Sequence, residues 1–338
     1  MNQVVKATVI ADSISIVSGK RITTIEAEFP RIILAEFNTH NAISKNASSS
    51  RAIPVPKMLD QVRNSPAMPA RFGAANKGMQ DAGEHHRLVD ISGFKDGSVM
   101  VTPEQAWAYF ALSAADDAER MTEAGYAKQI CNRLIEPFQM MKVVMTATDW
   151  QNFLWLRDHG AADPTIEQLA IAIREALENS APTPLAPGEW HTPYYKDGFW
   201  QPADGLECIR DDGEIVDAYG NTLQDALDIS ASCCAQVSFR SIDDTMEKAR
   251  SVVAKLNLKG EEPNQPVHAS PLEHQATPID ETGEYWDEDG EWGVNIMGKP
   301  STWEKGITHV SRDGVFGSGN LWDWIQLRQL VPNHVKRG

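Results

Sequence analysis

Residues 39 to 51 read THNAISKNASSSR, and this stretch says more about the fold than any other part of the sequence. It holds one histidine, two asparagines, four serines, one lysine and one arginine. Short polar side chains and free backbone donors at this density are suited to holding a phosphate or a polar ring. A Ser/Asn-rich capping loop explains the same composition, and the residues alone leave both interpretations open.

Regular elements on both sides of this stretch predict a fold with strands and helices. Residues 3 to 10 and 21 to 29 alternate apolar and polar side chains, as half-buried strands do, with a turn at 18 to 20. After Pro30, helical spacing over residues 31 to 40 leads into the polar loop. Downstream, residues 142 to 148 suggest a strand, and helices are predicted near 58 to 64 and at 102 to 124, 127 to 135, 149 to 158, 164 to 179, 222 to 239, 243 to 256 and 321 to 330.

The composition is that of a folded globular protein. Its 338 residues are 42% hydrophobic, which is enough to bury a sizeable core. No stretch reaches the roughly 18 consecutive apolar residues of a membrane span, and the first residues lack the order of a signal peptide. We therefore expect a cytoplasmic protein with no membrane partner. The four cysteines form no Cys-x-x-Cys pair, so neither a disulfide framework nor a zinc site is expected.

The charge balance argues against one class of partner. Asp and Glu number 47 and Lys and Arg number 31, which gives a net charge of -16. Such a charge repels a nucleic-acid backbone, so we expect no general DNA or RNA binding. A small anion can still bind where a few arginines converge.

Two arginines lie in apolar surroundings. Arg133 follows QICN and Arg157 follows NFLWL. An unpaired charge among such residues is costly, so each arginine needs an anionic partner. That partner is either a ligand or a neighbouring carboxylate, such as Glu136 or Asp158.

A third polar pattern is HASPLEH at residues 268 to 274, where two histidines and a glutamate crowd the start of a short helix. Its spacing fits none of the usual zinc motifs. Helix capping by Ser270, with Glu273 three residues later, explains the block more simply. We predict no metal site.

Four blocks of this sequence together resemble the flavin-dependent thymidylate synthases. That family is marked by RHRxxSxNxxSxR, and residues 39 to 51 match five of its seven fixed positions in register. NRLIEP at 132 to 137 and NFLWLR at 152 to 157 are similar to two further family blocks. HASPLEH matches a fourth, His-x-Ser/Thr-Pro-x-Glu-His, and SASCCAQVSF at 230 to 239 resembles the segment that precedes it.

The order of the blocks differs from the family, because HASPLEH follows the polar loop instead of preceding it. The resemblance therefore implies a circular permutation, which packing tolerates when termini lie close together. It also implies an α/β (α+β) fold with a central sheet flanked by long helices, assembled as a homotetramer. We expect residues 1 to 200 to form the flavin- and nucleotide-binding core, and residues 201 to 338 to add a permuted helical segment and an extension, packed into the same domain.

The resemblance also implies a chemistry and a set of site residues. The reaction transfers a one-carbon unit from methylenetetrahydrofolate to C5 of dUMP and reduces it, giving dTMP, with FAD as cofactor and NADPH as cosubstrate. Arg157 and Arg51 are the implied catalytic residues. The implied nucleotide-binding residues are Ser49, Ser50, Arg51, Arg133, Arg157 and Glu36. The implied FAD-binding residues are His40, Asn41, Ser44, Asn46, Asn152, His268, Ser270 and Glu273.

Two departures from the family motif leave the exact reaction open. Thr39 and Asn41 stand where the family has arginines, and each loss removes a contact worth roughly 1.5 to 3 kcal/mol. Lys45 or a group from the C-terminal extension could compensate. Alternatives are a related modification of a pyrimidine deoxynucleotide, such as hydroxymethylation for modified DNA, or a catalytically silent nucleotide-binding homologue.

Overall fold

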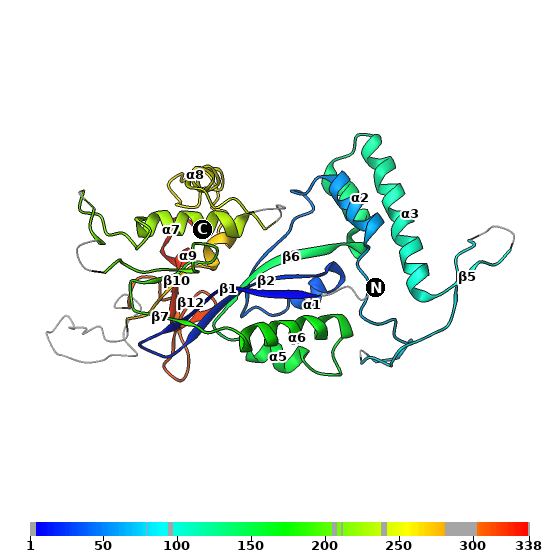
Figure 1. The fold of residues 1–338 in the computed structure, drawn as a ribbon, viewed down its shortest axis with the longest axis horizontal. Helices are drawn as coiled ribbons and strands as arrows, with labels where there is room; N and C mark the ends of the chain where they lie inside the picture. Colours follow the sequence, from blue (N-terminus) through cyan, green and yellow to red (C-terminus); the bar gives the residue numbers. More distant parts are fainter. Residues whose placement is uncertain are drawn as a thin grey trace.

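The structure is a computed structural model that describes residues 5–78, 80–93, 97–204, 208–210, 212–237, 242–280 and 303–336. Its architecture is mixed α/β, with sheets and helices distributed along an elongated molecule (Figure 1). No helix in the described part of the chain is both long enough and apolar enough to cross a membrane.

A five-stranded sheet lies at the centre. Its strands, in spatial order, are β3 (Ser44–Ala47), β6 (Met140–Ala147), β2 (Arg21–Pro30), β1 (Lys6–Ser15) and β7 (Thr183–Leu185). The predicted hairpin is confirmed: β1 and β2 pair antiparallel, and Gly19 adopts a positive φ of 70° in the turn. β6 pairs antiparallel with both β2 and β3, so part of the polar stretch that was interpreted as a loop is an edge strand.

Helices α5 (Gln151–Arg157) and α6 (Pro164–Glu178) lie together on one side of this sheet (Figure 1). α6 begins where the Asp163 side chain accepts hydrogen bonds from two backbone N–H groups of its first turn. Its buried face carries Ile166, Leu169 and Ile173, which join β2 and β6 side chains in the largest apolar cluster. The sequence spacing that predicted this helix is therefore also the spacing that packs it.

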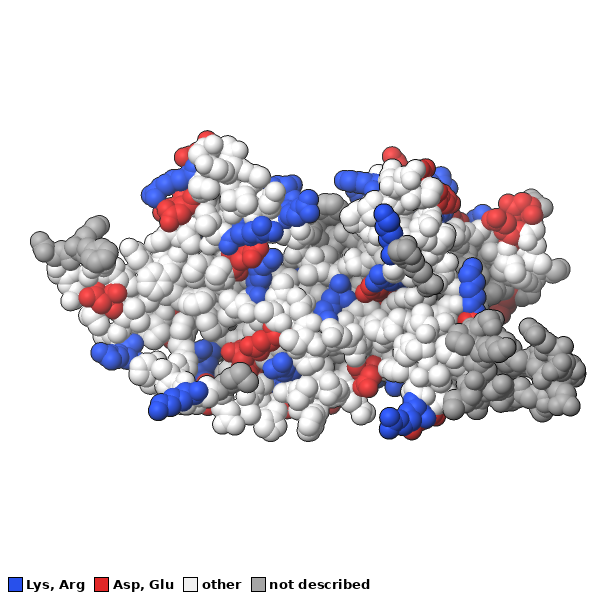
Figure 2. Space-filling view, turned by 180° about the vertical axis from the view of Figure 1, so that it is seen from behind, with Lys and Arg blue, Asp and Glu red and all other residues white. Residues whose placement is uncertain are grey.

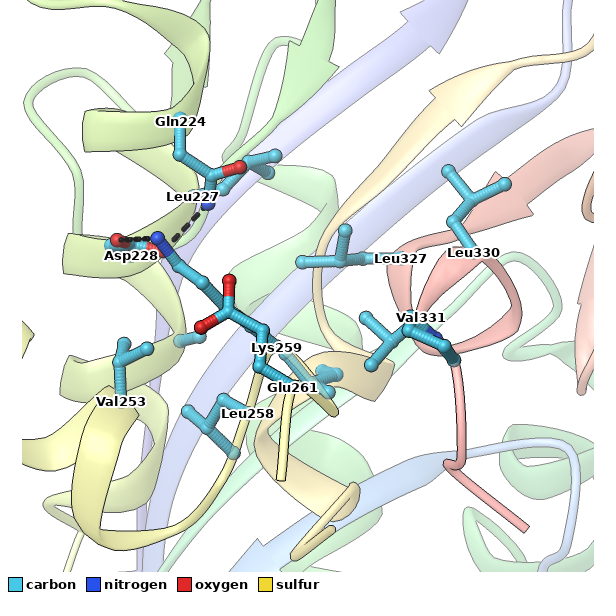
Figure 3. Close-up of a pocket in the computed structure, with 13 residues that line it drawn as sticks. Gln224, Leu227, Asp228, Val253, Leu258, Lys259, Glu261, Leu327, Leu330 and Val331 are labelled. Atoms are coloured by element: carbon cyan, nitrogen blue, oxygen red, sulfur yellow. Dashed lines mark hydrogen bonds and ion pairs between the residues drawn. The ribbon is translucent and has the colours of Figure 1, made fainter. Parts of the chain in front are cut away.

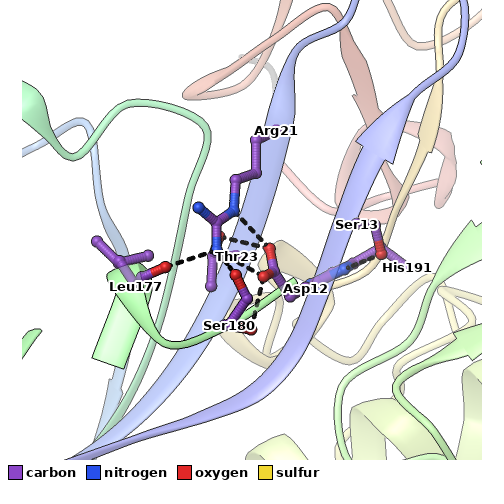
Figure 4. A network of polar contacts seen from close by, with 7 residues as sticks. All are labelled: Asp12, Ser13, Arg21, Thr23, Leu177, Ser180 and His191. Atoms are coloured by element: carbon purple, nitrogen blue, oxygen red, sulfur yellow. Dashed lines mark hydrogen bonds and ion pairs between the residues drawn. The ribbon is translucent and has the colours of Figure 1, made fainter. Parts of the chain in front are cut away.

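A buried polar network ties the end of α6 to the hairpin (Figure 4). Arg21 donates to both carboxylate oxygens of Asp12 at 2.8 and 2.6 Å, and it also donates to the Leu177 carbonyl. The Thr23 and Ser180 hydroxyls complete the partners of Asp12 at 3.0 and 2.6 Å. A buried carboxylate is tolerated when it is paired and hydrogen-bonded in this way.

The longest helix does not cover the central sheet. α3 (Pro103–Glu123) packs its alanine-lined face against α2 (Val55–Asn64) and α4 (Lys128–Leu134), and these three helices form a second core at one end of the molecule (Figure 1). Thr102 and Gln105 form the reciprocal capping box that begins α3, as the Thr-Pro-Glu start predicted.

The opposite end is built on a four-stranded sheet in the order β14 (Trp324–Gln326), β10 (Ala276–Pro278), β8 (Trp190–His191) and β9 (Phe199–Trp200). Helices α7 (Leu223–Ala235) and α8 (Met246–Lys255) pack beside it. Strands from both sides of residue 200 share this sheet, and a division of the chain at that residue stays a prediction. The remaining strands are β4 (Val89–Asp90), β5 (Met100–Val101), β11 (His309–Val310), β12 (Phe316–Ser318) and β13 (Leu321–Trp322).

Two helix predictions need correction. The helix expected over 31 to 40 is only a 3-10 turn, η1 (Arg31–Ile33), followed by α1 (Leu34–Phe37). The helix expected over 321 to 330 is wrong for most of its length: β13 and β14 occupy it, and only α9 (Leu327–Leu330) is helical. A short apolar run does not distinguish a buried strand from a helix by its period, and Asp323, with a φ of 62°, breaks the run. The sequence DETGEYWDEDGEWGVN at 280 to 295 is acidic and aromatic, which predicts a surface loop or hairpin, but it lies almost entirely outside the described residues.

Candidate functional site

The edge strand β3 is where distant blocks of the sequence meet. Asn46 donates a hydrogen bond from Nδ2 to the carbonyl oxygen of Cys234 in α7, at 3.1 Å. The turn of HASPLEH forms a 3-10 helix, η4 (Ser270–Glu273), which packs against both β3 and α7. Three of the sequence blocks are therefore in contact, although more than 180 residues of chain separate Asn46 from the other two.

His40 is held next to Arg157 at the start of this polar stretch. Arg157 donates from Nε to His40 Nε2 at 3.0 Å, and the His40 ring packs edge-on against Phe153, with ring centroids 4.9 Å apart. Because Nε2 accepts a hydrogen bond, His40 is neutral and carries its proton on Nδ1. Burial lowers the pKa of His40, and the nearby charges of Arg157 and Lys45 lower it further.

Lys45 packs against His40 and Phe37. Its Nζ donates to the His40 carbonyl oxygen at 2.7 Å and lies 5.5 Å from the centre of the Phe37 ring. Burial lowers the pKa of Lys45, and the carboxylate of Glu273 partly opposes this shift. Lys45 is thus a partly desolvated cation.

The C-terminal extension forms a further wall of this site, which the sequence did not predict. Gln326 donates from Nε2 to the Glu273 carbonyl at 3.2 Å and to Asn320 Oδ1 at 2.9 Å. Asn320 accepts from Ser44 Oγ at 3.0 Å and donates to the Ala42 carbonyl at 3.1 Å.

Arg328, in α9, completes this wall with an ion pair to Glu273. The only sequence signal for the wall was the presence of Asn320, Gln326 and Arg328 among the polar residues of 320 to 330. The helix that was expected there gave no indication that these three side chains lie on the same side.

The second half of the expected site is different in character. Arg51 and Arg133 are exposed, so the prediction that Arg133 is embedded among apolar side chains is wrong. The Asn132 side chain organises this half, because its Nδ2 donates to the Ser50 and Ile53 carbonyls at 2.9 Å each and fixes the serine-rich loop to α4.

The carboxylates expected to pair with the two arginines serve other residues. Glu136 pairs with Arg31 at 2.9 Å, and Asp158 pairs with Arg174 at 2.7 Å. Arg157 lies instead 3.7 Å from Glu36, a weaker contact at the surface. Its terminal amino groups are therefore the part of this guanidinium best placed to meet a ligand.

Other expected site residues lie at the surface. Asn41, Asn152, His268 and Ser270 are all exposed. Ser270 does not cap the turn as predicted, because Ala269 is the N-cap and no side chain accepts a cap hydrogen bond there. These side chains point to solvent in a single copy of the chain, in contrast to His40, Ser44 and Asn46.

A chain of buried hydrogen bonds runs from the HASPLEH block across the central sheet. His274 Nδ1 contacts Thr146 Oγ1 at 2.8 Å, Thr146 contacts Thr24 at 2.6 Å, and Thr24 contacts His191 Nε2 at 2.8 Å. His191 Nδ1 then meets Ser13 at 2.9 Å (Figure 4). Burial lowers the pKa of both histidines to about 3, so both rings are neutral. We name these five residues the buried relay.

The relay constrains its own protons. Each hydroxyl and each neutral ring donates a single proton, but a hydroxyl can accept two hydrogen bonds, so the tautomer of each histidine decides whether it donates to its neighbouring hydroxyl or accepts from it. His274 Nε2 is buried without a partner among the described residues. It is a donor or an acceptor according to which ring nitrogen of His274 carries the proton. The relay also fixes the backbone at Glu273, because His274, at one end of the relay, is the next residue in the chain.

The cysteines do not provide a nucleophile near this site. Burial raises the pKa of Cys233 to about 12 and raises the pKa of Cys234 well above its ordinary value. Both thiols are therefore protonated at neutral pH. Within the described parts of the chain, no group of three His, Cys, Asp or Glu side chains is placed to hold a metal ion.

A cavity of about 330 Å³ lies on the α7 side of the HASPLEH turn (Figure 3). Its walls are mainly apolar and include Leu227, Leu272 and Leu327. Lys259 pairs with Asp228 at 3.1 Å on its rim. The turn thus separates a polar side, facing β3, from an apolar side, facing α7.

Figure 2 shows one face of the molecule, on which Lys and Arg side chains stand singly or beside Asp and Glu. Positive charge on this face is thus local. This distribution differs from the continuous basic surface that tracks a nucleic-acid backbone.

Comparison with known proteins adds the following. No protein-family model and no curated protein matches the sequence. The structure is similar to thymidylate synthase X (ThyX) from Helicobacter pylori with FAD and dUMP, at 19% identity and a TM-score of 0.30, over 46% of this chain and 67% of that chain. It is also similar to the UMP/dUMP methylase PolB from Streptomyces cacaoi bound with 5-Br UMP, at 13% identity and a TM-score of 0.38, over 51% of this chain and 88% of that chain.

Proposed function

We propose that this protein is a flavin-dependent enzyme that methylates dUMP at C5 to give dTMP. The observation that carries the proposal is the convergence at β3 of blocks that are far apart in the chain. His40 meets Arg157, Asn46 meets α7, and Ser44 lies beside the turn that carries Glu273. Sequence blocks selected only for their resemblance to one family thus form one contiguous site.

The residues present fit a flavin nucleotide and a second nucleotide. Arg157 and Lys45 bring positive charge to His40, and Arg328 brings it to Glu273, while the Asn320 and Gln326 amides add neutral hydrogen-bonding groups. FAD, when bound, supplies the hydride, and methylenetetrahydrofolate and NADPH are the proposed cosubstrates. The protein contributes binding and orientation, since Cys233 and Cys234 are protonated and buried.

Each half of the site has its own proposed task. The inner half, which comprises His40, Lys45 and Glu273, holds FAD through side chains that the fold already fixes. The outer half, with Ser49, Arg51 and Arg133, holds the phosphate and ring of dUMP together with Arg157. Arginine forks suit both groups, because they form paired hydrogen bonds and stabilise negative charge that develops on the pyrimidine.

We further propose that the working form is a homo-oligomer, a tetramer by resemblance, in which sites lie between subunits. Trp155 is 77% exposed and Leu156 is 44% exposed, and both stand next to Arg157. Large apolar side chains exposed beside a proposed site favour a covered interface. Light scattering of the purified protein measures this directly, and a monomer would contradict it. A cytoplasmic location remains part of the proposal.

A second candidate reaction is favoured by Thr39 and Asn41. Both are exposed and uncharged, whereas the family has arginines there. A changed charge at these positions alters the binding of ligands. The main alternative is therefore a different product of the one-carbon transfer, such as a hydroxymethylated pyrimidine.

Product analysis separates these reactions. The protein is incubated with FAD, NADPH, methylenetetrahydrofolate and dUMP, and the nucleotide is analysed by mass spectrometry. A methyl group on the pyrimidine supports the proposal, and a hydroxymethyl group supports the alternative. An unchanged nucleotide in the presence of bound FAD contradicts both and favours a silent homologue.

A further inference from the structure

Asn132 occupies a buried polar position to which the family resemblance gives no role. Its side chain is fully buried in α4, and Nδ2 donates to the Ser50 and Ile53 carbonyl oxygens at 2.9 Å each. These two carbonyls belong to the loop of residues 49–53, and Arg51 lies between them in the chain. One side chain of α4 therefore holds the loop on both sides of Arg51.

The loop forms its own turn, and α4 fixes where that turn lies. The Ser49 carbonyl accepts from the backbone N–H groups of the two residues that follow Arg51, at 3.0 and 3.2 Å, and Ser49 Oγ accepts from the Arg51 N–H at 3.2 Å. These hydrogen bonds stay within the loop. Asn132 supplies the buried link to the helix, and Lys128 adds a longer contact at the surface, 3.4 Å from Nζ to the Ala52 carbonyl.

The surroundings of Asn132 within its own core do not explain a polar residue at this position. Its Oδ1 is buried without a hydrogen-bond partner among the described residues. Cys131 and Ile135, which lie close to it in the chain, belong to the apolar core that α4 shares with α2 and α3. An unpaired buried acceptor costs about 1 to 3 kcal/mol, so packing alone favours an apolar side chain here. The two Nδ2 hydrogen bonds offset this cost, and both of them act on the loop.

The same side chain connects the two arginines of the outer half. Arg133 follows Asn132 directly in α4, and Arg51 lies between the two carbonyls that Asn132 binds. Both arginines are exposed, and neither guanidinium has an ionic partner among the described residues. Arg31 and Arg63, on neighbouring elements, instead pair with carboxylates at 2.9 and 2.7 Å. Asn132 thus fixes, relative to each other, the backbones that carry two unpaired cations.

We propose that Asn132 is a positioning residue for the phosphate of the nucleotide substrate, because it holds the loop of residues 49–53 against α4 so that Arg51 and Arg133 meet one anion together. This inference rests on the proposed function, which assigns both arginines to dUMP. Two guanidiniums bind one phosphate best when their backbones are already aligned, since ordering a free loop on binding costs affinity. Asn132 supplies that alignment before the ligand arrives.

The test compares Asn132→Leu with a matched loss of a buried amide, Gln139→Leu. Gln139 is also buried, and its Nε2 donates to the backbone carbonyl of Asn132 at 3.0 Å, so it supports the helix itself. For Asn132→Leu we expect KM and the dissociation constant for dUMP to rise about tenfold, with kcat at saturating dUMP and uptake of FAD within about twofold of the wild type. Gln139→Leu should leave all four quantities within about twofold.

Further measurements separate positioning from folding. Thermal unfolding shows whether each variant is folded. If Asn132→Leu is not, Asn132→Ser, which retains one donor, replaces it and should show a smaller change in the same direction. Hydrogen exchange reads the loop without a ligand: the backbone amides of residues 51–53 should exchange about tenfold faster in Asn132→Leu than in the wild type or in Gln139→Leu.

A double-mutant cycle tests whether the two arginines act together. Arg133→Gln should cost less dUMP affinity in the Asn132→Leu background than in the wild type, because the loop that brings Arg51 to the same anion is no longer held there. Equal costs in the two backgrounds would contradict a joint action through Asn132.

Three other results overturn the inference while the proposed function stands. In the first, folded Asn132→Leu binds dUMP within about twofold of the wild type. In the second, Gln139→Leu loses as much dUMP affinity as Asn132→Leu, which indicates a structural role. In the third, Asn132→Leu leaves the exchange of residues 51–53 unchanged. A wild type that takes up FAD but binds no dUMP contradicts the proposed function instead, and the exchange rates then decide separately whether Asn132 holds the loop.

Discussion

The two halves of the candidate site differ in how the fold holds them. In the inner half, His40, Lys45 and Glu273 are fixed by hydrogen bonds and ion pairs to elements from across the chain. In the outer half, Arg51 and Arg133 reach into solvent, and only the backbone beneath them is fixed, by Asn132. The difference indicates that the inner half is organised before any ligand binds. The outer half depends on a ligand or on a second copy of the chain.

The largest expected effect comes from removing Arg157, which the proposed function assigns to dUMP. Arg157→Gln should lower kcat/KM for dUMP by about a hundredfold or more, because under that proposal it removes a charge that stabilises the reacting nucleotide. It should also raise the pKa of His40 toward its ordinary value, since Arg157 is one of the groups that lower it. Steady-state kinetics measures the first effect, and NMR titration of the histidines measures the second. An unchanged His40 pKa would contradict the assigned contact.

A change in the buried relay should act on stability. Thr146→Val removes a hydroxyl that bonds to both Thr24 and His274. It leaves the buried His274 Nδ1 without this partner and takes one of two partners from Thr24. We expect the free energy of unfolding to fall by about 1 to 3 kcal/mol, measured by urea denaturation. Thr122→Val, at a half-buried position of α3 where the hydroxyl donates only to the Ala118 carbonyl of its own helix, is the matched control and should stay within about 0.5 kcal/mol. Equal effects of the two variants would show that the relay is not a stabilising unit.

The same relay predicts a pH dependence. His191 and His274 have folded pKa values of about 3, whereas the unfolded value lies near 6.5. The unfolded state therefore binds more protons between these values, so stability is full above pH 6.5 and falls as the pH drops. Each histidine contributes a loss of about 1.4 kcal/mol per pH unit in that window.

Urea denaturation at pH 7.5 and 5.5 measures this slope. His274→Gln should reduce the slope by the share of one histidine. A slope that is unchanged by this substitution would mean that His274 is not buried in its neutral form.

The smallest expected effect belongs to the outer half. Arg133→Gln should change the free energy of unfolding by no more than about 0.5 kcal/mol, because the side chain is exposed. It should nevertheless weaken dUMP binding if Arg133 meets the nucleotide. A strongly destabilised Arg133→Gln would show that this arginine is structural, and the contrast between the two halves would fail.

Local signals predicted many of the elements but not how they combine. Alternation in residues 21 to 29 gave β2, and the Thr-Pro-Glu start gave α3, because strand period and helix caps are local properties. The same reasoning misplaced residues 321 to 330, since β14 is defined by its pairing with β10, which lies far away in the sequence.

The candidate site, too, was predictable where the signal is local and not where it depends on distant contacts. The polar residues of 39 to 51 and the glutamate of HASPLEH were identified from spacing, and the structure links Ser44 and the Glu273 carbonyl through Gln326. Arg328 was not found, because its importance comes only from its position opposite Glu273. Its neighbours in the sequence carried no motif that marks a ligand site.

The most direct test of the central claim is the visible absorption spectrum of the purified protein, supplemented with FAD and then titrated with dUMP. If FAD and dUMP share the site at β3, flavin bands accompany the protein through gel filtration and shift when dUMP is added. Arg157→Gln should weaken the response to dUMP. A protein that takes up no FAD under these conditions would contradict the account.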